Sequence, residues 1–152
     1  MMIELREIKD IDTLIDWRRE VIKNVFGQEA ELTLLEANRQ YYLRHVADGS
    51  HVALVALCEG EDCGCGGICF SDELPSPDNP SGKCAYLMNI YVRKAYRNKG
   101  IAHRIVSRLV SEAKKHACGK IYLETTADGK PVYASLGFRD MADMMKYYDT
   151  DN

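Results

Sequence analysis

Three consecutive segments in the second half of the chain have the pattern of a β-α-β unit. Residues 85–92 form a nearly continuous apolar run, residues 101–117 repeat apolar residues at helical spacing, and residues 120–125 form a second strand-like run. A parallel strand pair with a right-handed crossover places the start of the helix at the carboxyl end of the first strand. Because α/β sheets bind ligands at that end, we expect the binding site there.

Positive charge is concentrated where this helix begins, although the whole chain carries a formal net charge of −3. The first acidic residue after position 93 is Glu112. Cations in the first turn of a helix are opposed by the positive end of its dipole, so the pattern predicts a negatively charged ligand. The cations are Arg93, Lys94, Arg97, Lys99, Arg104 and Arg108.

Small residues at the same place favour a phosphate-binding loop. In the segment Arg97-Asn-Lys-Gly100-Ile-Ala102, Gly100 and Ala102 let a diphosphate approach free backbone amides, while Arg97 neutralises its charge. No Ser, Thr or Asp could cap these amides. The segment is not a kinase-type P-loop, because no Gly-Lys-Ser/Thr follows. An ordinary solvated basic helix start is the alternative interpretation.

Two motifs carry a family resemblance. Arg97, Gly100 and Ala102 match the pattern Arg/Gln-x-x-Gly-x-Gly/Ala, and residues 133–138, Tyr-Ala-Ser-Leu-Gly-Phe, match Tyr-x-x-x-Gly-Phe. Together they resemble the GNAT superfamily of acyl-CoA-dependent N-acyltransferases. The resemblance covers residues 85–138 well and the upstream part more loosely.

The resemblance implies a fold and a co-substrate. The expected fold is α/β (α+β): one domain over residues 1–152, with a mixed, mostly antiparallel sheet of six to seven strands, a central parallel β-α-β unit and flanking helices. Acetyl-CoA is the implied co-substrate, its pyrophosphate on the loop and its pantetheine arm along the preceding strand end. Thr126 stands where many relatives carry an Asn. The implied coenzyme residues are Ile90, Tyr91, Val92, Arg97, Asn98, Lys99, Gly100, Ile101, Ala102 and Thr126.

The rest of the chain predicts the remaining elements. Asp10 is a plausible N-cap for a helix to about Phe26, and Thr33 with Glu36 reads as the capping box of a second helix. The apolar stripe of the first helix contains Ile11, Leu14, Ile15, Arg18, Val21, Ile22 and Val25. Further along, the sequence predicts a strand over 51–58, a glycine-rich turn over 59–66, a strand over 67–70, a proline-containing loop over 71–83, a short helix over 131–136, and closing strands over 138–141 and 144–148.

The implied reaction is the attack of an amine on an acetyl thioester, which needs oxyanion donors, an acid and a neutral amine. Tyr133 is the candidate acid, because a phenol stays protonated at neutral pH and can donate to the departing sulfur. Its alternative is a packing role at a helix end. A backbone N–H at the end of the 85–92 strand, that of Val92 or a neighbour, would stabilise the oxyanion.

The base and the acceptor contacts stay open. Asn89 is an anomaly in an apolar strand, because a buried amide needs partners and could orient the acceptor or a water. It could equally satisfy a neighbouring backbone group. Glu73, in the proline-containing loop, is a second candidate contact to the acceptor. Candidate general bases, each of which could also be a solvated surface residue, are Glu73, Glu124, Glu20 and Glu31.

The cysteines offer a competing hypothesis. Cys63-x-Cys65 is a single pair rather than the two paired units typical of zinc sites, so reduced and mostly buried thiols, with no metal, are favoured. A redox or metal-binding module around Cys58, Cys63, Cys65 and Cys69 is the alternative.

A different alternative to the acetyltransferase function is a CoA-binding sensor or interaction module that has lost catalysis. The presence of Tyr133 argues against it.

Composition limits the partners. Every apolar run is far shorter than the roughly 20 residues of a membrane span, and residues 1–6 are no secretory signal, so we expect a cytoplasmic protein without membrane contact. The acidic balance argues against a general nucleic-acid binder and favours a cationic amine as acceptor, either a small molecule or a peptide. The terminal strand could pair with another subunit in a homodimer.

Overall fold

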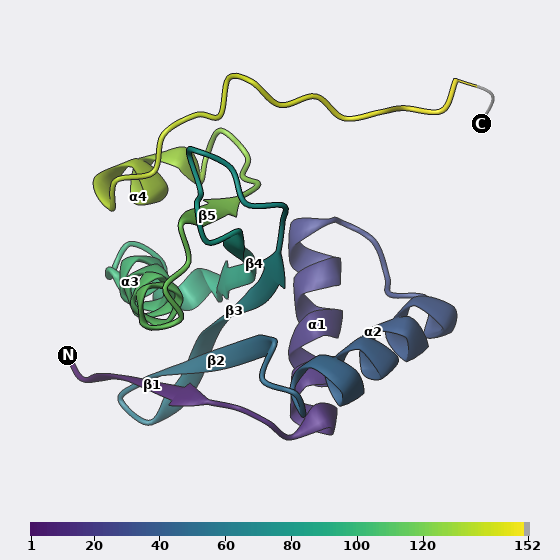
Figure 1. Cartoon of the computed structure of the whole chain (residues 1–152). Helices are drawn as coiled ribbons and strands as arrows, with labels where there is room; N and C mark the ends of the chain where they lie inside the picture. The colour runs from purple at the N-terminus through teal and green to yellow at the C-terminus, as the bar shows by residue number, and fades with distance from the viewer. Residues whose placement is uncertain (151–152) are drawn as a thin grey trace.

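One mixed sheet of five strands organises the chain in the computed structural model, which describes residues 1–150 (Figure 1). The strands follow chain order across the sheet, and each neighbouring pair is antiparallel except the parallel pair β4 and β5. The strands are β1 (Ile3–Glu7), β2 (His51–Cys58), β3 (Glu61–Asp72), β4 (Lys83–Val92) and β5 (Lys120–Leu123).

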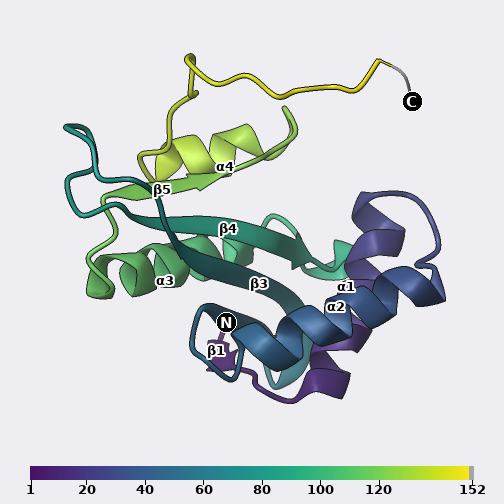
Figure 2. The ribbon, with the colours of Figure 1, turned by 45° about the vertical axis from the view of Figure 1, so that its right-hand side comes forward.

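Helices cover both faces of this sheet. Figures 1 and 2 show α3 on one face, α1 and α2 on the other, and α4 beside β5. Among the described residues, no helix combines the length and the apolar character that crossing a membrane requires. The helices are α1 (Ile11–Val25), α2 (Leu32–His45), α3 (Ile101–Lys115) and α4 (Lys130–Ser135), with a 3₁₀ turn over Lys94–Tyr96 before α3.

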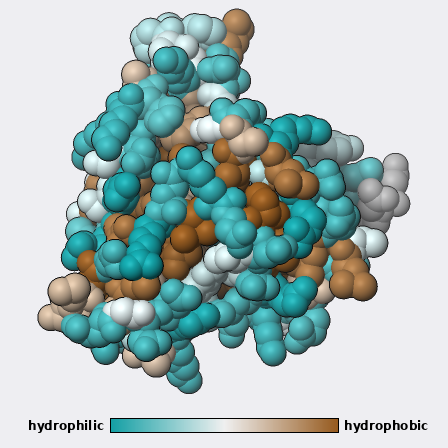
Figure 3. Space-filling model, turned by 90° about the horizontal axis from the view of Figure 1, so that it is seen from below, coloured by the Kyte–Doolittle hydropathy of each residue, from teal (hydrophilic) through white to brown (hydrophobic). Residues whose placement is uncertain are grey.

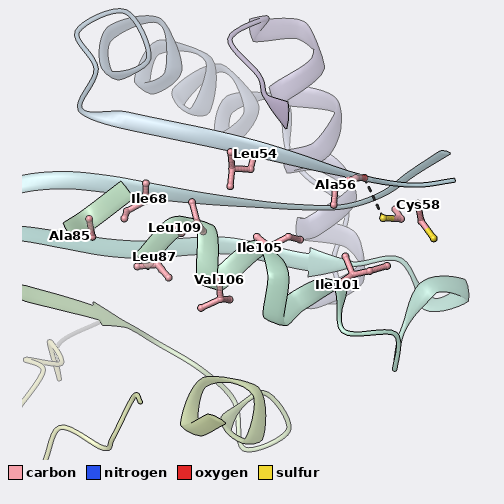
Figure 4. Packing of buried hydrophobic residues seen from close by; sticks show 12 residues of the cluster. Leu54, Ala56, Cys58, Ile68, Ala85, Leu87, Ile101, Ile105, Val106 and Leu109 are labelled. Atoms are coloured by element: carbon pink, nitrogen blue, oxygen red, sulfur yellow. Dashed lines mark hydrogen bonds between the residues drawn. The ribbon is translucent and has the colours of Figure 1, made fainter. Parts of the chain in front are cut away.

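The largest core cluster lies between α3 and the sheet (Figure 4). Ile105, Val106 and Leu109 are completely buried against the strands, and Ile101 is only 1% exposed. The helical spacing of these apolar residues is the pattern that predicted the crossover helix, and burying each such side chain contributes about 1.5–3 kcal/mol. The predicted β-α-β unit is therefore confirmed.

Two smaller clusters join α1 and α2 to the opposite face. Leu14, Ile15 and Ile22 pack with residues of α2, while Trp17 and Val21 pack on β2, β3 and β4. Seen from below, hydrophilic side chains cover most of the surface, and apolar ones show between them near its centre (Figure 3). The chain therefore forms three layers, with helices outside and the sheet between them.

The first two helices begin in different ways. Asp10 caps α1 as predicted, because its carboxylate accepts a hydrogen bond from the Thr13 backbone N–H at 3.0 Å. The predicted capping box of Thr33 and Glu36 is wrong. Helix α2 already begins at Leu32, and its N-cap Glu31 makes no side-chain capping bond, so both box residues lie inside the helix.

The predicted glycine-rich turn over 59–66 is mostly strand. The turn consists of Glu59 and Gly60, both with positive φ (50° and 83°), as a tight two-residue hairpin turn requires. The following glycines lie within β3, and at Gly66 helix α3 packs closely on the strand. A Cβ atom at Gly66 would lie 2.5 Å from Ile105 Cγ2. Glycine here serves close packing rather than chain reversal.

The two closing strands predicted over 138–141 and 144–148 are absent, so the sheet has five strands instead of six to seven. A strand is stable only when its backbone groups pair with a neighbour, and within residues 1–150 none pairs with this segment. The segment extends from α4 away from the sheet (Figures 1 and 2), and beyond Phe138 its methionines are exposed: Met141 46%, Met144 55% and Met145 99%.

Gly66→Ala should destabilise the domain, because the added methyl group would overlap the Ile105 side chain. Overpacking a core costs about 1–3 kcal/mol of the free energy of unfolding, which urea denaturation measures. Gly60→Asn is the control: this exposed turn has free space, and Asn tolerates positive φ, so its loss should stay below about 1 kcal/mol. Equal unfolding midpoints for Gly66→Ala and the wild type would contradict the packing role.

Candidate functional site

The candidate site opens where β4 and β5 separate. Their parallel pairing joins Cys84–Leu87 to Lys120–Leu123, after which β5 ends while β4 continues to Val92. Beyond Leu87, the edge of β4 that faced β5 has no strand partner in the described chain. A cavity of about 950 Å³ lies there, between the end of β4, the start of α3, the residues after β5, and α1, α2 and α4.

A β-bulge shapes β4 beside this cavity. Cys65 of β3 faces Tyr91 and Gly67 faces Met88, so two residues of β4, Asn89 and Ile90, oppose a single residue of β3. Asn89 has φ +58°, a left-handed conformation that Asn adopts more readily than most residues. The anomalous Asn of this apolar strand therefore occupies a bulge, and its side chain lines the cavity.

The turn between β4 and α3 has the geometry expected of a phosphate seat. Asn98 and Gly100 have positive φ (62° and 79°), and Gly100 is the N-cap of α3 without a side-chain capping bond. The first amides of α3 therefore lack the side-chain acceptor that an N-cap usually provides. A Cβ atom at Gly100 would meet nothing within 4 Å, so the turn has room for an anion.

The basic residues around this turn have separate roles. Arg97 lines the cavity, and its Nε donates to the Val92 carbonyl at 3.0 Å. Lys99 does not line it and lies 5.8 Å from the Tyr96 ring centroid. Arg108 pairs with Glu112 at 3.3 Å, so part of the predicted cationic cluster is neutralised within the chain.

Arg93 belongs to the interface between α1 and β4. Its guanidinium donates two hydrogen bonds of 2.9 Å to the carboxylate of Glu20 and lies 4.6 Å from the Trp17 ring centroid. The hydrogen bonds from Arg93 keep the pKa of Glu20 below its ordinary value. Glu20 is therefore an ionised structural partner of Arg93, which makes it a weak candidate for a general base.

Tyr133 of α4 lines the same cavity as the start of α3. Burial raises the pKa of its phenol, so the hydroxyl stays protonated across the neutral range. Its ring packs edge-on against Phe138 at a centroid distance of 5.9 Å. Thr126 also lines the cavity, in a loop that the hydrogen bond from the Gly129 N–H to the Thr126 carbonyl closes at 3.2 Å.

The other end of the cavity is formed by α1, α2 and the start of β2. Tyr41 Oη lies 2.8 Å from Nδ1 of His51, and burial lowers the pKa of His51 to about 4, so the ring is neutral at pH 7. Burial raises the pKa of Tyr42 to about 12. These groups are neutral hydrogen-bonding partners rather than charged ones.

Arg18 of α1 is the charged residue at this end that sequence reasoning missed. The sequence places it in the apolar stripe of α1, where a cation is out of place. That mismatch is the signal that could have found it. Its guanidinium donates to the side-chain oxygens of Asn38 at 3.0 Å and Asn89 at 2.8 Å.

The structure separates the candidate carboxylates. Glu124, directly after β5, lines the cavity. Glu73 does not: it lies at the opposite end of β4, where Lys120 Nζ is 3.3 Å from both of its carboxylate oxygens. Glu31 occupies the N-cap position of α2 on the exposed surface, without a side-chain capping bond. All other predicted site residues except Lys99 line the one cavity: Asn89, Ile90, Tyr91, Val92, Arg97, Asn98, Gly100, Ile101, Ala102, Thr126 and Tyr133.

The cysteines are reduced and dispersed in the structure. Cys63 lies in the cluster under α3 and donates to the Ala56 carbonyl at 3.3 Å, whereas Cys65 lies in the cluster under α1. Burial raises the pKa of both thiols, which disfavours the reactive thiolate. Over residues 1–150, no three His, Cys, Asp or Glu side chains gather in a group that could hold a metal ion.

Known proteins share this architecture over nearly the whole chain. A predicted acetyltransferase from Clostridium acetobutylicum, solved with acetyl-CoA, superposes with a TM-score of 0.87 at 28% identity and covers 97% of this chain and 96% of its own. A GCN5-related N-acetyltransferase from Ralstonia eutropha superposes with a TM-score of 0.80 at 27% identity, over 97% and 99% of the two chains.

Sequence comparison gives the same assignment. A curated protein of Oryza sativa subsp. japonica, "Probable glucosamine 6-phosphate N-acetyltransferase 2", is 34% identical over 67 residues, which is 44% of this chain and 40% of that protein. The chain thus aligns with less than half of that relative's length. The acetyltransferase (GNAT) family profile matches residues 11–138, which include both predicted motifs. The chain therefore belongs to the acetyltransferase (GNAT) family.

Proposed function

We propose that the protein is an N-acetyltransferase that transfers an acetyl group from acetyl-CoA to the primary amine of an acceptor. The observation that carries this proposal is the position of one cavity at the separated ends of β4 and β5, lined both by the uncapped start of α3 and by Tyr133. The acetyl-CoA in the structure of the Clostridium relative supports the choice of co-substrate.

The coenzyme would occupy the part of the cavity between β4 and α3. The free amides at the start of α3 and the guanidinium of Arg97 suit the two phosphates, because both donate to anionic oxygens. The edge of β4 from Ile90 to Val92, which has no strand partner in the described chain, offers backbone hydrogen bonds to the amides of the pantetheine arm. These contacts would direct the thioester toward the middle of the cavity.

The reaction would then be a direct transfer. The amine nitrogen forms a bond to the acetyl carbon, and a backbone N–H near Val92 stabilises the oxyanion of the tetrahedral intermediate. The intermediate collapses by breaking the carbon–sulfur bond, and Tyr133 donates its proton to the departing sulfur. The proton that the amine loses goes to Glu124, directly or through water, since Glu124 lines the cavity.

The acceptor we propose is a small molecule with a primary amine. The partial match to a protein named as an amino-sugar phosphate acetyltransferase supports this class. A CoA-binding module without catalysis would share the coenzyme contacts but would release no CoA thiol from acetyl-CoA in the presence of any amine. Turnover assays with an amine panel therefore distinguish the two functions.

Acetyl-CoA and free CoA should each raise the melting temperature of the purified protein, because a ligand that binds only the folded state stabilises it.

Ala102→Glu should weaken coenzyme binding at least about tenfold, since it adds a carboxylate in the first turn of α3 beside the proposed phosphates. Ser107→Glu is the matched control: it adds the same charge to an exposed position of α3 outside the cavity. Wild-type affinity in Ala102→Glu would place the phosphates elsewhere.

Tyr133→Phe should lower kcat about 10²-fold, the usual size of a general-acid contribution, while leaving the CoA-induced shift in melting temperature intact. In the wild type, kcat should fall at high pH as the Tyr133 phenol ionises. This fall should come above the ordinary pKa of Tyr, because burial raises the pKa of Tyr133. This limb should disappear in Tyr133→Phe. Tyr147→Phe, on the exposed segment after α4, is the control. An unchanged kcat across the pH range would remove Tyr133 from the acid role.

A further inference from the structure

Arg18 places a positive charge at the acceptor end of the cavity. It comes from the sheet-facing side of α1, it is half-buried, and it lines the cavity together with Tyr41, Tyr42 and His51. Its guanidinium carbon lies 5.6 Å from the ring centroid of Phe26. The cation is therefore held within an aromatic part of the cavity rather than free on the surface.

The charge of Arg18 is not balanced by the chain itself. Within residues 1–150, its side-chain hydrogen-bond partners are two neutral amide oxygens, and no carboxylate forms an ion pair with it. Arg93, on the neighbouring strand end, differs because two bonds of 2.9 Å join it to Glu20. A half-buried charge without a counter-ion is costly, so such a charge usually has a role in binding.

The amide contacts hold the guanidinium in one orientation. Asn38 is itself fixed, because its Nδ2 donates to the Leu34 carbonyl at 2.6 Å within α2. Asn89 is fixed by the bulge of β4. A guanidinium has five N–H donors, and these two bonds use one on Nε and one on a terminal nitrogen. The remaining three donors suit the oxygens of a carboxylate or phosphate.

We infer that Arg18 binds an anionic group of the acceptor, so that the acceptor is a small amine that also carries a carboxylate or phosphate. This inference rests on the proposed acetyltransferase function. The lining charges match such an acceptor: Arg18 would hold the anion, and Glu124 would receive the ammonium proton. The net acidity of the chain favours a cationic amine, and the charges that line the cavity support an acceptor that carries an anionic group as well.

The test compares acceptors that differ only in the anion. Glucosamine 6-phosphate against glucosamine tests phosphate, and an amino acid against its amide tests carboxylate. In the wild type, the anionic member of at least one pair should have a higher kcat/KM by about 10- to 100-fold, the range that charge-assisted hydrogen bonds of about 1.5–3 kcal/mol give. Equal kcat/KM values within both pairs would overturn the inference.

Variants separate binding from packing. Arg18→Gln should remove the preference by raising KM more for the anionic acceptor than for the neutral one, while the CoA-induced melting shift persists. Arg18→Lys should restore part of it, since it keeps the charge without the planar fork. Arg19→Gln, an exposed neighbour on α1 outside the cavity, is the matched control. An equal loss for both members of a pair in Arg18→Gln would show a purely structural role.

A binding measurement decides the matter even if no acceptor of the panel is acetylated. With CoA present at saturation, inorganic phosphate or acetate should bind the wild type and Arg19→Gln more tightly than Arg18→Gln, by calorimetric titration. The same affinity in all three proteins, or no binding of either anion, would overturn the inference. Loss of CoA binding itself would instead contradict the proposed function, so the two failures are distinct.

Discussion

The short parallel pairing of β4 and β5 is the constraint on which the site depends. Four residue pairs join the two strands, and then β4 continues alone to Val92. The cavity lies in this gap between the two strands. It is lined by the free edge of β4, the start of α3 and the loop after β5. A longer ladder would close the gap and bury the backbone groups that the proposed coenzyme needs.

The bulge at Asn89 connects the two halves of the cavity. Its backbone interrupts the ladder with β3 next to Tyr91, on the proposed coenzyme side, while its side chain accepts a hydrogen bond from Arg18 on the proposed acceptor side. One residue in a left-handed conformation therefore fixes both the direction of the β4 end and the orientation of the guanidinium. This double role explains why an amide stands in a strand of apolar residues.

The sequence predicted the parts of the structure that depend on local patterns. The crossover helix, the uncapped Gly100 turn and the Asp10 cap are each encoded within a few neighbouring residues, and the structure has all three. Features that depend on distant partners were missed. Glu20 and Arg93 are 73 positions apart, so no local sequence pattern showed that Arg93 is paired with Glu20. Gly66 looked like a turn because the helix that needs the space, α3, comes much later in the chain.

The glycines of β3 have a consequence for the energetics of ligand binding. With no side chains beneath it at Gly64 and Gly66, α3 sits directly on the sheet, and its buried residues lock it there. The first turn of α3 and the end of β4 are thus held at a fixed separation before any ligand arrives. A diphosphate bound there, as we propose, would meet donors that are already aligned, so little of its binding free energy would be consumed in ordering the protein.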